Sequence, residues 1–311
     1  MSLRFFDFHE DVFLIRYIFF TFVRNFINHK LTFLTPNSMK KYLIFTLITV
    51  LIALESCAAK KDHYSEVRFE TNFGKITVKL YPETTKHRDN FSKLVKEGFY
   101  NGVLFHRVIK DFMIQAGDPD SKKAQPGAML GSGDVGYTIP AEFVYPQYYH
   151  KRGALAAARE GDSVNPQKAS SGCQFYIVQG KTFTDDDLNS MEINNKNKLE
   201  ARLFQNIVDS KQEEINKYRQ ERNQSKLDIL RDSILKVVKA EIQAKPTYKF
   251  TAQQRNDYKT IGGTPHLDGN YTVFGEVIEG MDIVEKISKT KTGANDRPVE
   301  DIRIIKAIYI K

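Results

Sequence analysis

Residues 105–119 read Phe-His-Arg-Val-Ile-Lys-Asp-Phe-Met-Ile-Gln-Ala-Gly-Asp-Pro, and this stretch decides the fold and the chemistry. It places one permanent cation, Arg107, near two large apolar side chains, Phe112 and Met113, and an amide, Gln115. If the segment is extended, its side chains alternate between two faces, so Arg107, Met113 and Gln115 share one side. An apolar pocket with one guanidinium and no acid–base pair suits a neutral substrate whose bond has only to twist.

The segments on either side of this stretch are mostly strand-like. Residues 66–80 alternate apolar and polar side chains around Asn72-Phe73-Gly74, which predicts a β-hairpin. Thr84 or Thr85 can cap a helix that runs to about Glu97. Further strands are expected at 153–158, 173–178 and 302–310, with a short helix at 281–287. Gly131-Ser-Gly-Asp-Val-Gly136 matches a dinucleotide-binding pattern, but no helix can easily follow it, so we interpret it as a surface loop.

Residues 185–245 differ from the rest of the chain. They contain almost no glycine or proline, and charged and amide side chains dominate. Apolar residues recur at helical spacing, first at Leu199, Leu203 and Ile207 and again from Leu227 to Val237. The pattern predicts two amphipathic helices in a hairpin, with the break near residues 223–225.

Four segments together resemble the cyclophilins, the peptidyl-prolyl cis-trans isomerases. The stretch 105–119 resembles their signature, and residues 153–159, 174–177 and 266–275 resemble three further parts of their binding site. The resemblance covers about 66–182 and 264–311. It implies a mainly β fold, a closed eight-stranded antiparallel barrel with two capping helices. The helical, hairpin-like insertion is additional.

The resemblance also implies roles for individual residues. Arg107 would be the catalytic cation, and Gln115 would bind the substrate backbone. The proline slot would be lined by Phe112, Met113, Tyr176 and Leu267. Further substrate contacts are expected from Ala158, Arg159, Gln174 and Tyr271.

Three positions depart from the common family pattern. Tyr176 replaces the usual phenylalanine, and its hydroxyl should seek a hydrogen-bond partner. Arg159 stands where asparagine is common, which puts the substrate-backbone contacts there in doubt. His266 replaces the tryptophan of the best-known eukaryotic members, which puts tight cyclosporin binding in doubt.

Composition limits the other classes of function. The chain has 311 residues and a formal charge of +8, to which residues 1–56 contribute +2 from six Lys/Arg and four Asp/Glu. The remaining +6 includes no block of basic residues, so nucleic-acid binding is not expected. Two cysteines, Cys57 and Cys173, cannot form a four-thiolate zinc site. The isomerase chemistry transfers no group or electron, so we expect no metal and no cofactor.

The N-terminal region resembles a bacterial lipoprotein signal. Met39-Lys40-Lys41 is a short basic start, an apolar run follows at 42–54, and Leu54-Glu-Ser-Cys57 ends it. Cys57 is then the lipidated first residue, facing the periplasmic side of the cell envelope. A transmembrane helix is the alternative, but about 13 apolar residues fall short of the roughly 20 that span a bilayer. Another alternative uses residues 1–56 as membrane spans.

These patterns divide the chain into six parts. We expect a non-native extension at 1–38, a signal peptide at 39–56 and a tether at 57–65. The catalytic domain then occupies 66–184 and 263–311, interrupted by the charged helical insert 185–262. The predicted substrates are proline-containing unfolded or flexible polypeptides among exported proteins.

Two alternatives stay open at this point. The protein could be a non-catalytic chaperone that uses the same pocket only to bind. The insert 185–262 could dock a client or partner, or it could be a functionally neutral insertion packed on the domain.

Overall fold

The computed structural model describes residues 64–244 and 249–311. The predicted extension, the signal peptide and Cys57 lie outside these residues. The first hairpin forms as expected from β1 (Ser65–Thr71) and β2 (Gly74–Leu80). The other strands of the main sheet are β3 (Phe105–Ile109), β4 (Met113–Ala116), β6 (Ala154–Ala157), β8 (Phe175–Val178), β9 (Val273–Glu279) and β10 (Ile304–Tyr309).

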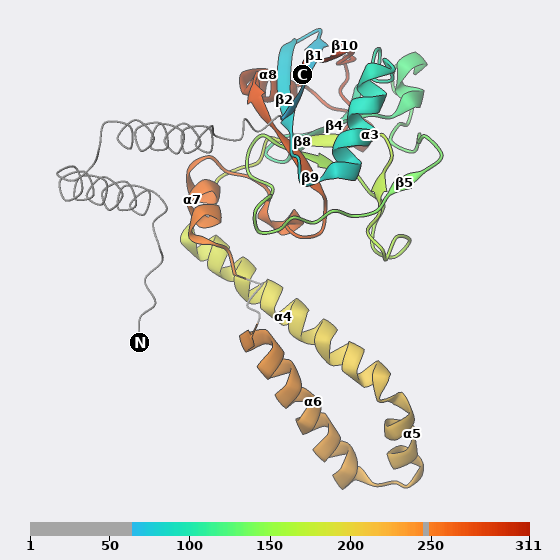
Figure 1. Ribbon diagram of the computed structural model, residues 1–311, viewed down its shortest axis with the longest axis vertical. Coiled ribbons are helices and arrows are strands. Elements are labelled where there is room, and N and C mark those ends of the chain that lie inside the picture. The colour runs from blue at the N-terminus through green and yellow to red at the C-terminus, as the bar shows by residue number, and fades with distance from the viewer. Residues whose placement is uncertain (1–63, 245–248) are drawn as a thin grey trace, which may run out of the picture. The chain divides into compact units, whose positions relative to one another are not determined.

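All eight strands pair antiparallel in the order β10-β1-β2-β9-β6-β8-β4-β3. Two helices, α3 (Thr85–Lys96) and α8 (Met281–Ser288), pack their apolar faces against the same core of the curled sheet. In Figure 1 they lie on either side of the strands. The core contains Phe91, Leu94 and Val95 of α3 and Ile283, Val284 and Ile287 of α8. A small separate sheet pairs β5 (Thr138–Ile139) with β7 (Ser170–Ser171).

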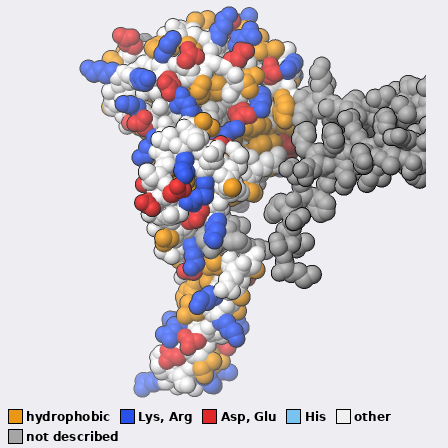
Figure 2. Space-filling view, turned by 90° about the vertical axis from the view of Figure 1, so that its left-hand side faces the viewer, with side chains coloured by type: hydrophobic (Ala, Val, Ile, Leu, Met, Phe, Trp, Pro, Cys, Tyr) orange, Lys and Arg blue, Asp and Glu red, His pale blue; other side chains and the backbone are white. Residues whose placement is uncertain are grey.

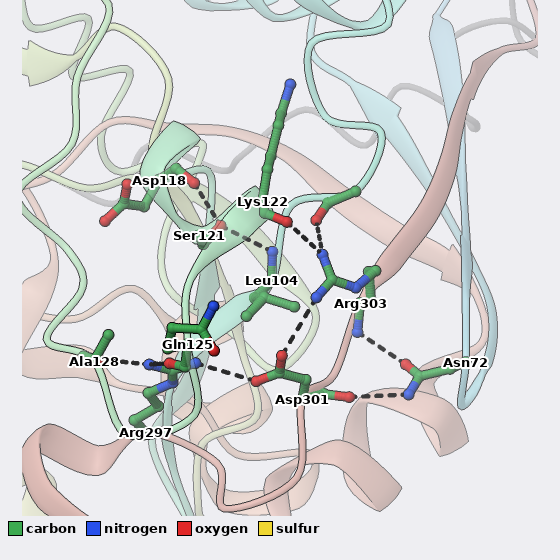
Figure 3. A network of polar contacts seen from close by, with 11 residues as sticks. Asn72, Leu104, Asp118, Ser121, Lys122, Gln125, Ala128, Arg297, Asp301 and Arg303 are labelled. Atoms are coloured by element: carbon green, nitrogen blue, oxygen red, sulfur yellow. Dashed lines mark hydrogen bonds and ion pairs between the residues drawn. The ribbon is translucent and has the colours of Figure 1, made fainter.

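The predicted closure of the barrel is wrong, because the sheet is open between its edge strands β10 and β3. Within the described residues, only an isolated bridge at Leu104–Arg303 and a few backbone hydrogen bonds join the two edges. The N–H groups of these two residues point away from the bridge: that of Leu104 donates to Ser121 Oγ at 3.0 Å, and that of Arg303 donates to Asn72 Oδ1 at 2.9 Å. These two contacts flank the bridge (Figure 3), and among the described strands the two edges do not form a longer ladder.

A polar network holds this opening together. Asp301 accepts from Arg297 at 3.2 Å and from Arg303 at 3.3 Å, and Arg303 also donates to the carbonyl of Lys122 (Figure 3). Arg297 is buried and donates to the carbonyls of Gln125 and Ala128. Buried charges persist only when they are paired and hydrogen-bonded, which is the case here.

The N-terminus of α3 is capped from outside the helix. Thr84 occupies the cap position, but its hydroxyl donates to the carbonyl of Tyr81 and does not cap the helix. The carboxylate of Glu142 accepts from the backbone N–H of Lys86 at 3.1 Å and of His87 at 2.9 Å. An acid at this end also complements the helix dipole. The predicted helix is confirmed, although a distant residue supplies its cap.

The insert between β8 and β9 is helical, as predicted. It comprises α4 (Asp185–Ser210), α5 (Gln212–Gln220), α6 (Gln224–Ala244) and α7 (Ala252–Thr260). The break predicted near 223–225 lies slightly earlier, at 221–223, and the structure adds a kink at Lys211 and the helix α7. Helices α4 and α6 lie side by side and bury Ile234, Val238 and Ile242 against apolar residues of α4 (Figure 1). We call α4, α5 and α6 the arm.

The ends of the insert are clamped to each other at the sheet. Lys181 and Gly263 exchange backbone hydrogen bonds of 3.3 and 3.0 Å. Gly180 has a φ of +65°, and a Cβ there would lie 2.5 Å from the Cα of Gly263. Only glycine avoids both the strain and the clash. The insert therefore emerges from one narrow neck.

Candidate active site

Arg107 reaches its position through a β-bulge in β3. Phe105 pairs with Ala116 of β4, whereas Arg107 pairs with Gln115, so the register shifts by one residue at His106. Without this shift Arg107 would face the same way as Phe105, into the hydrophobic core. Bulges commonly redirect a side chain next to an active site. The extra residue thus turns the only cation of the 105–109 strand to the opposite face.

The strand register places the predicted residues in one row. Arg107 pairs with Gln115, Gln115 with Tyr176, and Tyr176 with Ala156. Directly opposed residues on neighbouring strands are close enough for their side chains to interact. Met113, two residues before Gln115, lies on the same face and pairs with Val178. The grouping of Arg107, Met113 and Gln115 is confirmed, but a hairpin with a bulge produces it, not one extended segment.

An apolar cluster covers this face of the sheet. Met113 and Tyr176 are buried in it, and Phe112, Leu267, Tyr271 and Ala158 are partly buried against it. The ring of Phe112 also stacks on His266, with 5.5 Å between ring centroids. All four residues predicted to line a proline slot therefore share one cluster.

The Arg107 guanidinium is oriented by one acid. Its Nε donates to Asp296 Oδ2 at 3.3 Å, and its side chain is 42% exposed. Asp296 belongs to a short 3₁₀ turn, η3 (Ala294–Asp296). Among the described residues, neither Nη atom of Arg107 has a hydrogen-bond partner. Four of the five N–H donors therefore remain for a substrate.

Two amides continue the row. Gln115 Nε2 donates to Gln174 Oε1 at 3.0 Å, and Gln174 Nε2 donates to the carbonyls of Gly131 at 2.9 Å and Gly133 at 2.8 Å. These bonds fix both amide orientations and leave the Gln115 carbonyl oxygen free to accept from a peptide N–H. Gln115 and Gln174 line a cavity of about 870 Å³ together with Ala158 and Arg159. The glycine-rich segment forms one wall of this cavity as a loop, as we predicted.

Arg159 is held in the wall by its own contacts. Its guanidinium lies 4.4 Å from the ring centroid of Tyr271, and its Nε donates to the carbonyl of Asn270 at 2.8 Å. It also pairs with Asp162 at 2.8 Å. Arg159 therefore acts as a fixed wall, and Tyr271 presents an aromatic edge toward the ring of Tyr176.

Sequence reasoning missed a buried hydrogen-bond chain behind the slot, which we call the hydroxyl chain. Tyr176 Oη lies 2.9 Å from His150 Nε2, His150 Nδ1 lies 3.0 Å from Asp268 Oδ1, and Tyr258 Oη donates to Asp268 Oδ2 at 2.6 Å. A carboxylate only accepts, so His150 carries a proton on Nδ1. In the neutral imidazole Nε2 is then the acceptor, and Tyr176 donates to it.

The hydroxyl chain joins the insert to the slot. Tyr258 belongs to α7 of the insert, and Tyr176 is a wall of the slot. The expected partner for the Tyr176 hydroxyl exists and is His150. Only the tyrosine at 176 signalled it, because residues 150, 176, 258 and 268 are far apart in the sequence.

Two titratable groups near the row are held in their neutral forms. His106, next to Arg107, is buried, and burial lowers its pKa to about 4, so it is neutral at pH 7. Cys173 is a free, buried thiol, and burial raises its pKa to about 11. No cluster of three metal-ligating side chains occurs within residues 64–244 and 249–311. This arrangement can bind and polarise a neutral group.

The described helices give no membrane span. None of them in residues 64–244 or 249–311 is both long and apolar enough to cross a bilayer.

The hydroxyl chain makes a stability prediction. Tyr258→Phe should lower the free energy of unfolding by about 1–3 kcal/mol, because it removes one donor to the nearly buried Asp268 carboxylate. Chemical denaturation measures this. Tyr148→Phe is the matched control, since its hydroxyl contacts the carboxylate of Glu83 at an exposed site and should cost little. Equal losses in the two variants would contradict the prediction.

Comparison with known proteins agrees with this geometry. A family model described as cyclophilin type peptidyl-prolyl cis-trans isomerase matches residues 66–198 and 205–308. A relative from Staphylococcus haemolyticus that bears the name peptidyl-prolyl cis-trans isomerase is 31% identical over 252 residues, 81% of this chain and 93% of the relative. One from Staphylococcus aureus is 30% identical over 247 residues, 79% and 91% of the two chains.

Among solved structures, a cyclophilin type peptidyl-prolyl cis-trans isomerase of Cryptosporidium parvum aligns with a TM-score of 0.46 and 19% identity, over 80% of this chain and 99% of that one. The extent of the family match and the identity to full-length relatives decide the assignment. This chain belongs to the cyclophilin family and is a peptidyl-prolyl cis-trans isomerase.

Proposed function

We propose that Arg107 catalyses the isomerisation by stabilising the twisted amide. The observation that supports this is the guanidinium fixed through Nε to Asp296, with its Nη donors unpaired among the described residues, in line with Gln115 and Tyr176. The cluster of Phe112, Met113, Tyr176 and Leu267 receives the proline ring. Gln115 holds the substrate backbone.

The physical basis is the loss of amide resonance in the transition state. Resonance opposes rotation by about 18–20 kcal/mol. When the bond twists, the nitrogen lone pair is no longer delocalised and can accept a hydrogen bond. Arginine suits this role because it remains protonated and its donor fork is rigid. The nitrogen of a planar amide cannot accept a hydrogen bond from Arg107, whereas the nitrogen of the twisted amide can. The bond therefore stabilises the transition state and not the two planar isomers, and no covalent intermediate is required.

Arg107→Ala should reduce kcat/KM for proline peptides on the order of 100-fold, the typical loss when one preorganised donor is removed from a transition state. A protease-coupled assay with a short proline peptide measures the rate. Arg231→Ala on α6 is the matched control, because this arginine is exposed on the arm. Equal rates for wild type and Arg107→Ala would refute the catalytic role and favour a binding-only chaperone.

We also propose that the enzyme assists the folding of exported proteins, as a lipoprotein on the periplasmic side of the envelope. The support is the sequence of 39–57 alone, with its basic start, apolar run and terminal Cys57. Proline isomerisation takes tens to hundreds of seconds without a catalyst, so it can limit folding after export.

The anchor makes a mass prediction. The protein purified from membranes should begin at Cys57 and carry acyl chains there, and Cys57→Ala should leave the signal peptide 39–56 attached. Intact-mass spectrometry of both proteins measures this. A mature wild-type protein that begins elsewhere, or an unmodified Cys57, would refute the lipoprotein form.

A further proposal concerns the arm, which we infer to hold client chains near the slot. Its surface mixes Lys/Arg and Asp/Glu side chains with hydrophobic ones (Figure 2). Ile229 is 67% exposed and Ile193 is 59% exposed, so the packing of the arm helices buries neither side chain. Such scattered apolar side chains suit weak, sequence-tolerant contact with unfolded polypeptides.

Truncating the arm tests this proposal. Replacing residues 203–240 by a short Gly/Ser linker keeps α7 and Tyr258, so turnover of short peptides should persist. Refolding of a proline-limited protein and binding of an unfolded client should both weaken. Unchanged refolding and unchanged client binding would show that the arm is a neutral insertion.

A further inference from the structure

A second cleft, of about 420 Å³, opens between the insert and the loop 265–270. Lys198, Leu199 and Arg202 of α4 form one wall. The opposite wall is the 3₁₀ turn η2 (Pro265–Leu267) with the residues that follow it, through Asn270. We call this space the insert cleft. It exists only because the insert is present.

The insert cleft is cationic. Lys198 and Arg202 lie four residues apart and so share a face of α4. Both are exposed, and neither has an ion-pair or hydrogen-bond partner within residues 64–244 and 249–311. Lys168 is the third cation of the lining; its Nζ donates to Asn270 Oδ1 at 2.5 Å and lies 3.9 Å from Asp162, so the unpaired charge is that of Lys198 and Arg202.

The other titratable groups of the lining do not cancel this charge. Asp268 is the one carboxylate among the lining residues; its side chain is 5% exposed, and His150 and Tyr258 already occupy both of its oxygens. Burial lowers the pKa of His266 below its usual value, so His266 is neutral at pH 7. Tyr145 has its pKa raised by burial and is neutral as well.

The insert cleft shares a wall with the proline slot. His266 lines the cleft and stacks on Phe112 of the slot, and the next residue, Leu267, belongs to the slot's apolar cluster. An extended chain advances about 3.3–3.6 Å per residue. A polypeptide with its proline in the slot needs only a few residues to reach the cleft if its chain runs across η2.

We propose that the insert cleft is a specificity subsite for acidic side chains located within about four residues of the isomerised proline. Lys198 and Arg202 supply the charge, and the apolar Phe143 and Phe250 form part of the remaining lining. The proposal rests on the isomerase activity of the adjacent slot. It assigns the insert a role in selecting substrates, separate from any client holding by the rest of the arm.

The test uses proline peptides that carry Glu, Gln or Lys at each of the four positions on either side of the proline. For wild type, kcat/KM at one or two positions on one side should be about two- to fivefold higher for Glu than for Gln, as expected for an exposed charge pair. The preference should shrink as ionic strength rises. Lys198→Glu/Arg202→Glu should abolish or invert it, with turnover of the Gln peptides unchanged.

The matched control is Lys217→Glu/Arg219→Glu on α5, which changes the net charge equally outside the cleft and should keep the preference. Two results would overturn the proposal. One is a wild type without any Glu preference. The other is a preference that survives in Lys198→Glu/Arg202→Glu or disappears equally in the control. In either case, normal turnover of the Gln peptides would show that the isomerase activity is intact. A failure of the proposed isomerase mechanism would be seen separately, as an unchanged rate in Arg107→Ala.

Discussion

The active face depends on one register shift, the extra residue at His106 in β3. A strand exposes alternate residues to opposite faces, so an insertion of one residue exchanges the two faces from that point on. Phe105 therefore enters the core, and Arg107 faces the site two residues later. The same shift aligns Arg107 with Gln115 and Tyr176. Every later feature of the mechanism, including the bond to Asp296, requires Arg107 on this side.

Behind that face, the fold connects the insert to the slot through buried polar groups. Asp268 accepts from two segments, through His150 and through Tyr258 of α7, and His150 in turn bonds to Tyr176 of β8. Buried polar groups of this kind are costly when a partner is missing. Helix α7, at the base of the insert, is thus part of the structure around the slot. The arm, formed by α4, α5 and α6, is not part of the hydroxyl chain. This division explains why a truncation should spare Tyr258.

The sequence predicted the hairpin of β1 and β2, helices α3 and α8, the helical insert and the residues of the slot, because each has a local pattern or a family motif. It failed where long-range geometry decides. Barrel closure was wrong because, in the described part of the chain, the pairing between the two edges is limited to one bridge, Leu104–Arg303, and does not continue as a ladder. The cap of α3 was assigned to a neighbouring threonine, whereas Glu142 supplies it from a distant loop. The hydroxyl chain that joins Tyr176 to Tyr258 has no local sequence pattern, apart from the tyrosine at position 176.

The sequence by itself determined the family, the cation that we propose as catalytic and the chemical character of the slot, since these depend on residue types at short spacing. Tertiary structure alone decided which donors of Arg107 remain unpaired, what fixes Tyr176, and where the insert meets the slot. The physical reason is that hydrogen-bond partners and surface charge depend on distances between segments up to about two hundred residues apart, as for Arg107 and Asp296. No local pattern encodes such distances, and the insert cleft with Lys198 and Arg202 follows from them.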